Sequence, residues 1–425
     1  MDKKLVIRIK HRSQSEVMIQ LLVLLPFLLS ALTELLPFPD GIKYVCDAAW
    51  LYLLVLLIIQ RKPAGKGYAA LFSLIIFFFI YTVLNYVVNF QSPLYYLWGV
   101  RNNFRFYAAF LAFTYFLKEE QAEYYFSLFD KIFWIDAAVS LIQYYVFGID
   151  GDYLGGVFGA KNGCNGYTTV FFAIIVVKSV VFFLEGKETA WLCMAKCAVA
   201  LYIAALAELK FFFAAFLLIV LLGALWTGFT WRKLLLILGG ALGVSLGTAL
   251  LTQMFSGGVK WFTLEWLLET ASADRGYTSS GDLNRLNAIP QINELWLTNW
   301  GQRLFGLGLG NCDTSSFAIV NTPFYKANGD MHYTWICYAM MYLETGYIGL
   351  VFYWGFFALV FAGAHRIEKR SEGITKTYCR IAKIMAVMCV MITAYNSSLR
   401  TEAGYMAYFV LAIPFALGKR RSQQV

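Results

Sequence analysis

One histidine has sequence neighbours that could take part in acid–base chemistry. His332 lies near two carboxylates, Asp330 and Glu344. The other two histidines, His11 and His365, lie among basic residues. Histidine is the side chain whose ordinary pKa is nearest neutral pH, so His332 is the first candidate for a catalytic base, with Asp330 and Glu344 as the others. The alternative for His332 is a structural ring that is hydrogen-bonded to a backbone carbonyl.

Arginines and lysines form a second set of candidate residues. Lys210 and Arg400 each lie in a short turn between apolar segments, where an ionisable group is costly unless it is paired or faces a wet cavity. Guanidiniums suit a diphosphate because their charge is fixed and they bind two oxygens at once. Cations also stabilise a departing diphosphate. The members of the set are Arg101, Arg105, Lys161, Lys210, Arg275, Arg285, Arg303 and Arg400.

The alternative for these cations is local ion pairing, which would neutralise them and leave no anion site. The expected pairs are Lys210 with Glu208, Arg400 with Glu402, and Arg275 with Asp274.

Two further motifs resemble ligand sites only in part. Asp150-Gly-Asp152 places two carboxylates close together, but a glycine between two aspartates is more typical of a turn. Gly306, Gly308 and Gly310 match part of a dinucleotide fingerprint, yet no strand is predicted before them. We expect no metal, no nucleotide site and no cofactor. We expect the glycines to let the backbone approach a ligand or a neighbouring helix.

The elements that must position these residues are apolar segments. Of the 425 residues, 60% are hydrophobic and 14% charged, which is more apolar than the roughly half-apolar average of soluble domains. The apolar blocks have the length of a helix that spans a bilayer, so we predict an all-α polytopic integral membrane protein with about twelve transmembrane helices. The predicted spans are 17–37, 44–60, 69–90, 104–117, 124–147, 167–184, 190–207, 211–228, 234–254, 334–362, 380–397 and 402–418.

The spans divide the chain into three regions. Residues 1–254 hold the earlier spans, 255–333 form one large extracytoplasmic loop, and 334–425 hold the last spans and a cytoplasmic tail. The loop is far longer than an ordinary connection. It contains an amphipathic stretch at 259–269 and a predicted helix from the N-cap Asp282 to about residue 296. We expect the loop to complete a cavity among the helices.

Basic residues are concentrated in the N-terminal segment, in alternate short connections and in the C-terminal tail. The positive-inside rule therefore places both termini in the cytoplasm and the long loop outside. This distribution accounts for the net charge of +9, so we expect the bilayer rather than nucleic acid as a partner.

Several motifs occur in an informative order. They are Arg101-Asn102, Gly159-Ala-Lys-Asn162, Lys210, the stretch from Arg285 to Trp296, Gly306-Leu-Gly308-Leu-Gly310, His332, and Glu344-Thr-Gly346-Tyr-Ile-Gly349. This order, which is strongest over residues 200–405, resembles the superfamily of O-antigen polymerases and O-antigen ligases. The resemblance implies an architecture like that of GT-C glycosyltransferases in the bacterial cytoplasmic membrane, with an outward-facing active site.

The resemblance also implies a substrate and roles for residues. Members of the superfamily act on undecaprenyl-diphosphate-linked oligosaccharides, without a nucleotide sugar or metal. His332 is the implied base, although Tyr333 stands where the usual pattern has Asn. The implied diphosphate-binding residues are Arg285, Lys210, Arg275 and Arg400, with Arg303 and Arg101 as further members of the cationic set.

We therefore expect a polymerase that joins lipid-linked repeat units of a surface polysaccharide. Donor and acceptor would both be undecaprenyl-diphosphate-linked, and a chain-length regulator and a flippase are the expected protein partners. One alternative is an O-antigen ligase, which transfers the finished glycan to a lipid or protein. The other is a transporter of lipid-linked sugars, whose mark would be charges buried mid-span, with Lys131, Asp136, Lys178 and Lys196 as candidates.

Overall fold

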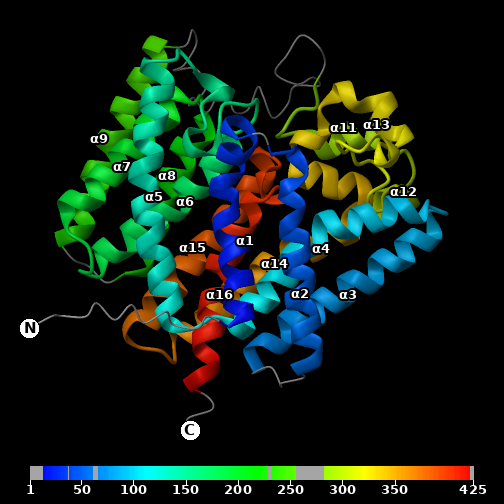
Figure 1. The fold of residues 1–425 in the computed structure, drawn as a ribbon, viewed down its shortest axis with the longest axis horizontal. Coiled ribbons are helices and arrows are strands. Elements are labelled where there is room, and N and C mark those ends of the chain that lie inside the picture. The colour runs from blue at the N-terminus through cyan, green and yellow to red at the C-terminus, as the bar shows by residue number, and fades with distance from the viewer. Residues whose placement is uncertain (1–12, 37, 61–65, 228–230, 255–281, 422–425) are drawn as a thin grey trace, which may run out of the picture.

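The computed structural model describes residues 13–36, 38–60, 66–227, 231–254 and 282–421, and over these residues all regular structure is helical (Figure 1). The long helices are α1 (Gln14–Ser30), α2 (Val45–Gln60), α3 (Lys66–Val88), α4 (Pro93–Phe116), α5 (Glu119–Tyr145), α6 (Asn165–Leu184), α7 (Ala190–Leu206), α8 (Lys210–Trp226), α9 (Trp231–Met254), α14 (Cys337–Glu368), α15 (Gly373–Tyr395) and α16 (Ala403–Arg421). Short helices connect them: η1 (Ala31–Leu35), η2 (Asp40–Tyr44), η3 (Gly151–Tyr153), η4 (Gly156–Phe158), α11 (Ala288–Leu295), α12 (Trp300–Phe305), η6 (Ala318–Val320), α13 (Pro323–Asn328), η7 (Gly329–Met331), η8 (Tyr333–Trp335) and η9 (Ser398–Arg400).

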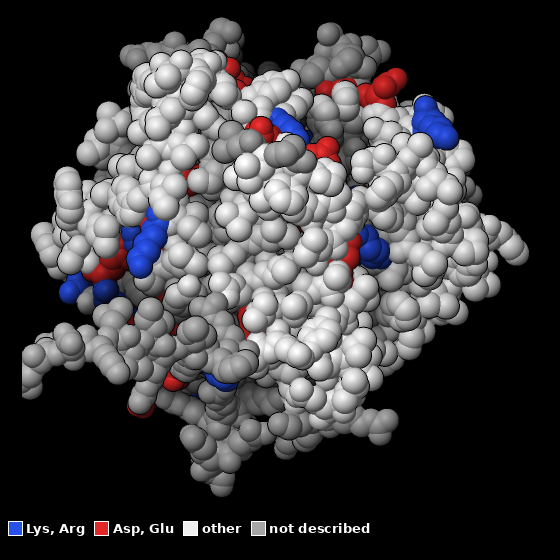
Figure 2. Space-filling model, viewed as in Figure 1, with Lys and Arg blue, Asp and Glu red and all other residues white. Residues whose placement is uncertain are grey.

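The composition of these helices is that of a multi-pass α-helical membrane protein. Within the described residues, seven helices are long and apolar enough to cross a membrane, and three shorter ones are apolar as well. Figure 2 shows a face that is largely uncharged, with basic and acidic residues in small mixed groups. A helix lies in each range that was predicted to span the membrane. However, α4 and α5 are not among the helices that are long and apolar enough to cross a membrane. The number of twelve spans therefore stays a prediction.

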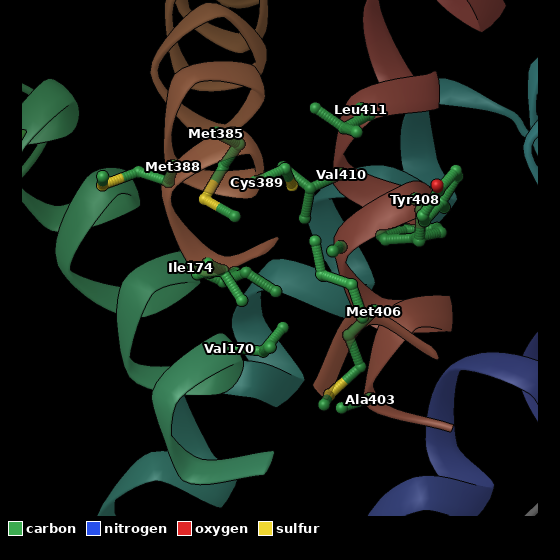
Figure 3. Close-up of a cluster of buried hydrophobic side chains, with 14 of the residues drawn as sticks. Val170, Ile174, Met385, Met388, Cys389, Ala403, Met406, Tyr408, Val410 and Leu411 are labelled. Atoms are coloured by element: carbon green, nitrogen blue, oxygen red, sulfur yellow. The ribbon is translucent and has the colours of Figure 1, made fainter. Parts of the chain in front are cut away.

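The core lies where α6, α15 and α16 meet. The apolar window of α6 is 89% buried, whereas that of the peripheral helix α9 is 17% buried. In Figure 3, Ile174 of α6 lies near Met385 and Cys389 of α15 and Met406 of α16. Neighbouring helices enclose α6 on most sides, so the end of α6 has a fixed position from which residues can be presented to a site.

Local sequence determines how α1 begins and ends. Ser13 and Glu16 form a capping box, in which each side chain accepts a hydrogen bond from the other's backbone N–H at 3.3 Å. At its other end α1 passes into the π-helical turn η1, and π-helical turns are frequent at functional sites. Ser30 donates a hydrogen bond to the Phe158 carbonyl, and Glu34 accepts one from the Ala160 N–H at 3.1 Å. The end of α1 is thereby attached to the 148–164 connection.

The predicted span 334–362 is not one continuous helix. Gly346 interrupts α14 with φ 62° and ψ −166°, a backbone conformation that is essentially restricted to glycine. A Cβ at this position would overlap the carbonyl of Leu304, which packs against the break. The sequence prediction missed the break because the apolar pattern continues through Gly346.

Candidate functional site

A cavity of about 810 Å³ is lined by residues from the end of α1, the start of α6 and the segment before α16. These segments lie at the end of the bundle opposite the start of α1 and the end of α16 (Figure 1). The end of α1 supplies an apolar part of the wall, including Pro26 and Leu29. The 152–167 segment and the 395–402 segment supply most of the polar wall. Further lining residues are Asp40, Lys43, Arg285, Ser316 and Trp335. Segments far apart in sequence thus form one site.

Hydrogen bonds hold the 148–164 connection in place beside the cavity. Asn165 Nδ2 donates to Asp152 Oδ1 at 2.8 Å and to the Ala207 carbonyl at 3.2 Å. The buried Asp136 accepts from the Val157 N–H at 2.8 Å. Asp152 therefore helps to order a turn, as the Asp150-Gly-Asp152 pattern indicated. Within the described part of the chain, no group of three His, Cys, Asp or Glu side chains could hold a metal ion.

Arg285 and Lys210 are the predicted cations that the structure brings together. Arg285 lines the cavity, and its guanidinium carbon lies 5.1 Å from the centre of the Tyr395 ring. Lys210, in the turn between α7 and α8, is close enough to Arg285 to interact with it electrostatically. Glu208 and Asp152 act on Lys210 with the opposite sign, because their negative charges stabilise its ammonium group. Arg285 lines the cavity and Lys210 does not, but a second cation within electrostatic range of the first favours an anion with more than one charge.

Arg400 does not form the expected ion pair with Glu402. Its Nη2 donates to Asp313 Oδ2 at 2.9 Å, and both side chains are almost buried. Asn102 Nδ2 binds the same carboxylate oxygen at 2.7 Å. The local pairing was predicted from proximity in sequence, but Asp313 lies on a connection that folds back onto this turn. Arg400 thus lies behind the wall formed by Ser398 and Glu402.

The other predicted diphosphate residues are more distant or lie outside the described residues. Arg101 binds Asp47 Oδ2 through Nε at 3.0 Å and Nη2 at 2.7 Å. Arg303 donates from Nε to the Leu297 carbonyl at 2.9 Å. Neither side chain lines the cavity. Arg275, and with it the expected pair Arg275–Asp274 and the amphipathic stretch 259–269, lies outside the described residues.

His332 lies directly behind the cavity wall. Its ring stacks on Trp335, which lines the cavity, with 3.9 Å between ring centres. Its Nδ1 lies 2.6 Å from Asp282 Oδ1. Asp282 is therefore not the predicted N-cap: α11 begins at Ala288 with Asn287 as its N-cap. The preceding backbone is instead tied to the His332 region, since the Leu283 N–H donates to the Met331 carbonyl at 2.9 Å.

The two other predicted bases do not line the cavity. Glu344 has no exposed surface, and its Oε1 accepts from the Cys312 N–H at 3.2 Å. Asp330 is exposed on the short helix η7. Glu344 is covered by the glycine motif, which folds back onto α14. Asp330 lies on η7, outside the cavity wall.

The glycine motif packs against neighbouring helices, as the sequence predicted. Gly306 lies against the backbone of Glu344 and Thr345, and Gly310 lies against Gly99 of α4. The Gly308 N–H donates to the Glu344 carbonyl at 2.9 Å. A side chain at Gly306 or Gly310 would overlap the neighbouring backbone, and one at Gly308 would overlap the Gln91 side chain. The motif is therefore structural and holds the region that precedes His332.

Sequence reasoning missed Glu402 as a cavity residue and treated it only as a partner for Arg400. Its Oε1 accepts from Arg105 Nη1 at 2.9 Å, and its Oε2 accepts from the Tyr167 hydroxyl at 2.9 Å. Burial alone would raise the pKa of the Glu402 carboxyl, but Arg105 and Tyr167 outweigh burial and hold this pKa below its usual value. A carboxylate in a tight turn between apolar segments was the available signal.

Comparisons with known proteins assign no residue in this cavity. No protein-family model matches the chain, and no curated protein matches it. The chemistry of the site is therefore inferred from its own residues.

Proposed function

We propose that the chain is a glycosyltransferase that polymerises lipid-diphosphate-linked oligosaccharides. In the proposed reaction, a hydroxyl of one lipid-linked unit attacks the anomeric carbon of another and expels undecaprenyl diphosphate. The observation that carries the proposal is the position of Arg285, on a polar cavity wall within electrostatic range of Lys210. The donor's own diphosphate bond supplies the free energy, so the proposal needs no nucleotide.

The chemistry of Arg285 and Lys210 supports a diphosphate leaving group. A guanidinium binds two oxygens of a phosphate through parallel N–H groups. Cations placed where negative charge develops stabilise the transition state, and each such group contributes about 10²–10³-fold in rate. The Tyr395 ring lies against the Arg285 guanidinium and restricts its orientation.

The walls of the cavity also support an amphipathic substrate. Pro26 and Leu29 of α1 provide apolar surface, whereas Asn162 and Asn396 present amides. Its volume of about 810 Å³ lies in the usual range for small-molecule sites. Such a cavity can take a sugar diphosphate while the lipid chain remains in the bilayer.

The buried charges of the helices give little support to the transporter alternative. Lys178 and Lys196 are buried, but both bind Asp130 and Glu188 in a compact group. Lys131 is exposed, and Asp136 accepts a hydrogen bond from the 148–164 connection. Lysines that are each bound to two carboxylates are typical of a structural network.

The proposal includes the setting predicted from the sequence. The protein would lie in the bacterial cytoplasmic membrane with both termini in the cytoplasm and the cavity facing outward. His332, with Asp282 at its Nδ1, is the base that the sequence predicts. A base oriented by a carboxylate is a common catalytic arrangement, but the position of His332 behind Trp335 leaves room for another proton acceptor.

Reconstitution with one substrate tests the proposed function. The purified protein is placed in liposomes with undecaprenyl-diphosphate-linked repeat units and no nucleotide sugar, and glycan length is measured by mass spectrometry. A polymerase lengthens the lipid-linked glycan. Transfer only to an added lipid A core or protein acceptor would instead indicate a ligase, and unchanged glycan in every arm would overturn the enzyme proposal.

A further inference from the structure

Glu402 is the buried carboxylate on the cavity wall. Its side chain is 8% exposed, and it lies between η9 and the start of α16. The other carboxylates that line the cavity, Glu34, Asp40 and Asp152, are all exposed. A group that must meet a sugar hydroxyl in one geometry is better supplied by a fixed side chain than by a mobile one.

Two helices hold the Glu402 carboxylate from separate directions. Arg105 on α4 binds one oxygen and Tyr167 on α6 binds the other, each at 2.9 Å. Arg105 is itself fixed, since its Nη2 donates to the Arg400 carbonyl at 2.7 Å. Each carboxylate oxygen can accept more than one hydrogen bond, so Glu402 can still accept a proton from a substrate in the cavity.

The bases predicted from the sequence are less well placed. The ring face of His332 is covered by Trp335, and its Nδ1 faces Asp282. Glu344 is enclosed beneath the glycine motif, as its zero exposure shows. Glu402 differs from both because it belongs to the wall of the cavity that holds Arg285.

We propose that Glu402 is the base that accepts the proton of the attacking sugar hydroxyl. This inference rests on the proposed function. As the hydroxyl oxygen forms a bond to the anomeric carbon, its proton moves to Glu402. The bond between that carbon and the diphosphate oxygen breaks, and the electron pair leaves with undecaprenyl diphosphate beside Arg285. The proton then passes from Glu402 to water in the cavity, which restores the carboxylate.

Carboxylates perform this task in glycoside chemistry, where one carboxylate activates the attacking hydroxyl group. Arg105 and Tyr167 stabilise the charged form of Glu402, which keeps the carboxylate free of a proton and also lowers its proton affinity. Ionisable side chains that interact electrostatically with the Glu402 carboxylate include Arg105 on α4, Tyr167 on α6, Cys46 on α2 and Tyr405 on α16.

A purely structural role is the competing account, because the buried Arg105 needs a counter-ion. Such a role predicts that variants of Glu402 lose stability and activity together. A base predicts a fall in kcat at constant fold, together with a change in the pH profile. The two accounts therefore differ in quantities that can be measured separately.

The first experiment compares Glu402→Gln with the wild type in the liposome assay. Glutamine keeps the shape and can still accept from Arg105 through its amide oxygen, but it cannot accept from Tyr167 through its amide nitrogen, and it accepts no proton. We expect kcat to fall by about 100-fold or more while KM changes less than about threefold and the protein remains folded. Glu294→Gln is the matched control, because Glu294 is exposed on α11 and does not line the cavity. Full kcat in folded Glu402→Gln would overturn the inference.

The second experiment uses Tyr167→Phe and remains decisive if Glu402→Gln fails to fold. Loss of the Tyr167 hydrogen bond removes stabilisation of the carboxylate and raises the pKa of Glu402. The acidic limb of the rate profile should move to higher pH, with the rate largely restored at alkaline pH. An acidic limb in the same place as in the wild type would overturn the inference. A wild-type protein that lengthens no glycan would overturn both proposals together.

Discussion

The two ends of the helical bundle use charge in different ways. At the end away from the cavity, Lys196 lies 2.8 Å from Asp130 and 3.1 Å from Glu188, and its side chain is 1% exposed. At the cavity end, Arg285 and Glu402 lie on a wall that faces open volume. Opposite charges enclose one another at the first end, whereas at the second the buried Arg105–Glu402 pair also borders the cavity.

A second enclosed group reinforces the contrast. Glu368 binds Arg380 Nε at 2.8 Å and Lys383 Nζ at 2.6 Å where α14 meets α15. These residues also line no part of the cavity. Buried ion pairs stabilise little on balance, but removing one partner is costly because the other is left buried and unpaired. Variants at the far end should therefore affect folding, and variants at the cavity end should affect chemistry.

The largest expected effect is at the enclosed end. Lys196→Met leaves Asp130 and Glu188 with one lysine instead of two, and we expect the free energy of unfolding to fall by about 3–5 kcal/mol. Thermal unfolding in detergent measures this loss. Lys131→Met is the control, because Lys131 follows Asp130 directly in α5 but is exposed. Its loss should change the free energy of unfolding by about 0.5 kcal/mol or less. Equal stability in both variants would remove the contrast between the ends.

Arg285→Ala should have the next largest effect, and on activity alone. Loss of a cation at the departing diphosphate should lower kcat by about 10²–10³-fold with little change in melting temperature. Arg285→Lys should also be impaired, because lysine lacks the planar fork. Lys326→Ala, at an exposed lysine of α13, should retain wild-type activity. Normal chain growth by Arg285→Ala would remove the diphosphate role.

The break in α14 gives a smaller and structural effect. Gly346→Ala places a side chain in a left-handed conformation and against the Leu304 carbonyl, so we expect a loss of about 1–3 kcal/mol in stability. Gly355→Ala, in the regular part of the same helix with room for a Cβ, should be neutral or slightly stabilising. A harmless Gly346→Ala would show that α14 is continuous in solution.

The smallest effect is expected at the exposed edge of the cavity. Lys161 lies 3.3 Å from Asp40, and both side chains are more than half exposed. Such pairs contribute about 1 kcal/mol or less, so Lys161→Ala should leave the melting temperature nearly unchanged. Any rise in KM should be small and should shrink at high ionic strength. A large loss of stability would place Lys161 among the enclosed charges instead.

Much of the fold could be predicted from the sequence, because long apolar segments impose helices. The close packing of the glycine motif also followed from residue types. Arg285 was a candidate from its residue type and lines the cavity, and its role stays a prediction. Ion-pair partners could not be predicted. Arg400 binds Asp313 rather than Glu402, and Glu402 binds Arg105. These contacts join segments that are distant in sequence, and their pairing depends on how the helices pack.

The position of the proton acceptor was the other point beyond sequence reasoning. His332 was chosen because histidine titrates near neutral pH, a property of the residue type alone. Its stacking on Trp335 and its contact with Asp282 depend on the chain folding back at η7. The same is true of the contacts of Glu402 with Arg105 of α4 and Tyr167 of α6, on which its proposed role rests.

The most direct test of the central claim is the stoichiometry of lipid release. In liposomes that contain only undecaprenyl-diphosphate-linked repeat units, we expect one undecaprenyl diphosphate to be released for each unit added to the glycan. In Arg285→Ala, the release of undecaprenyl diphosphate and the growth of the chain should both fall, and by the same factor. Chain growth without this release, or release that does not depend on Arg285, would contradict a diphosphate leaving group at this cavity.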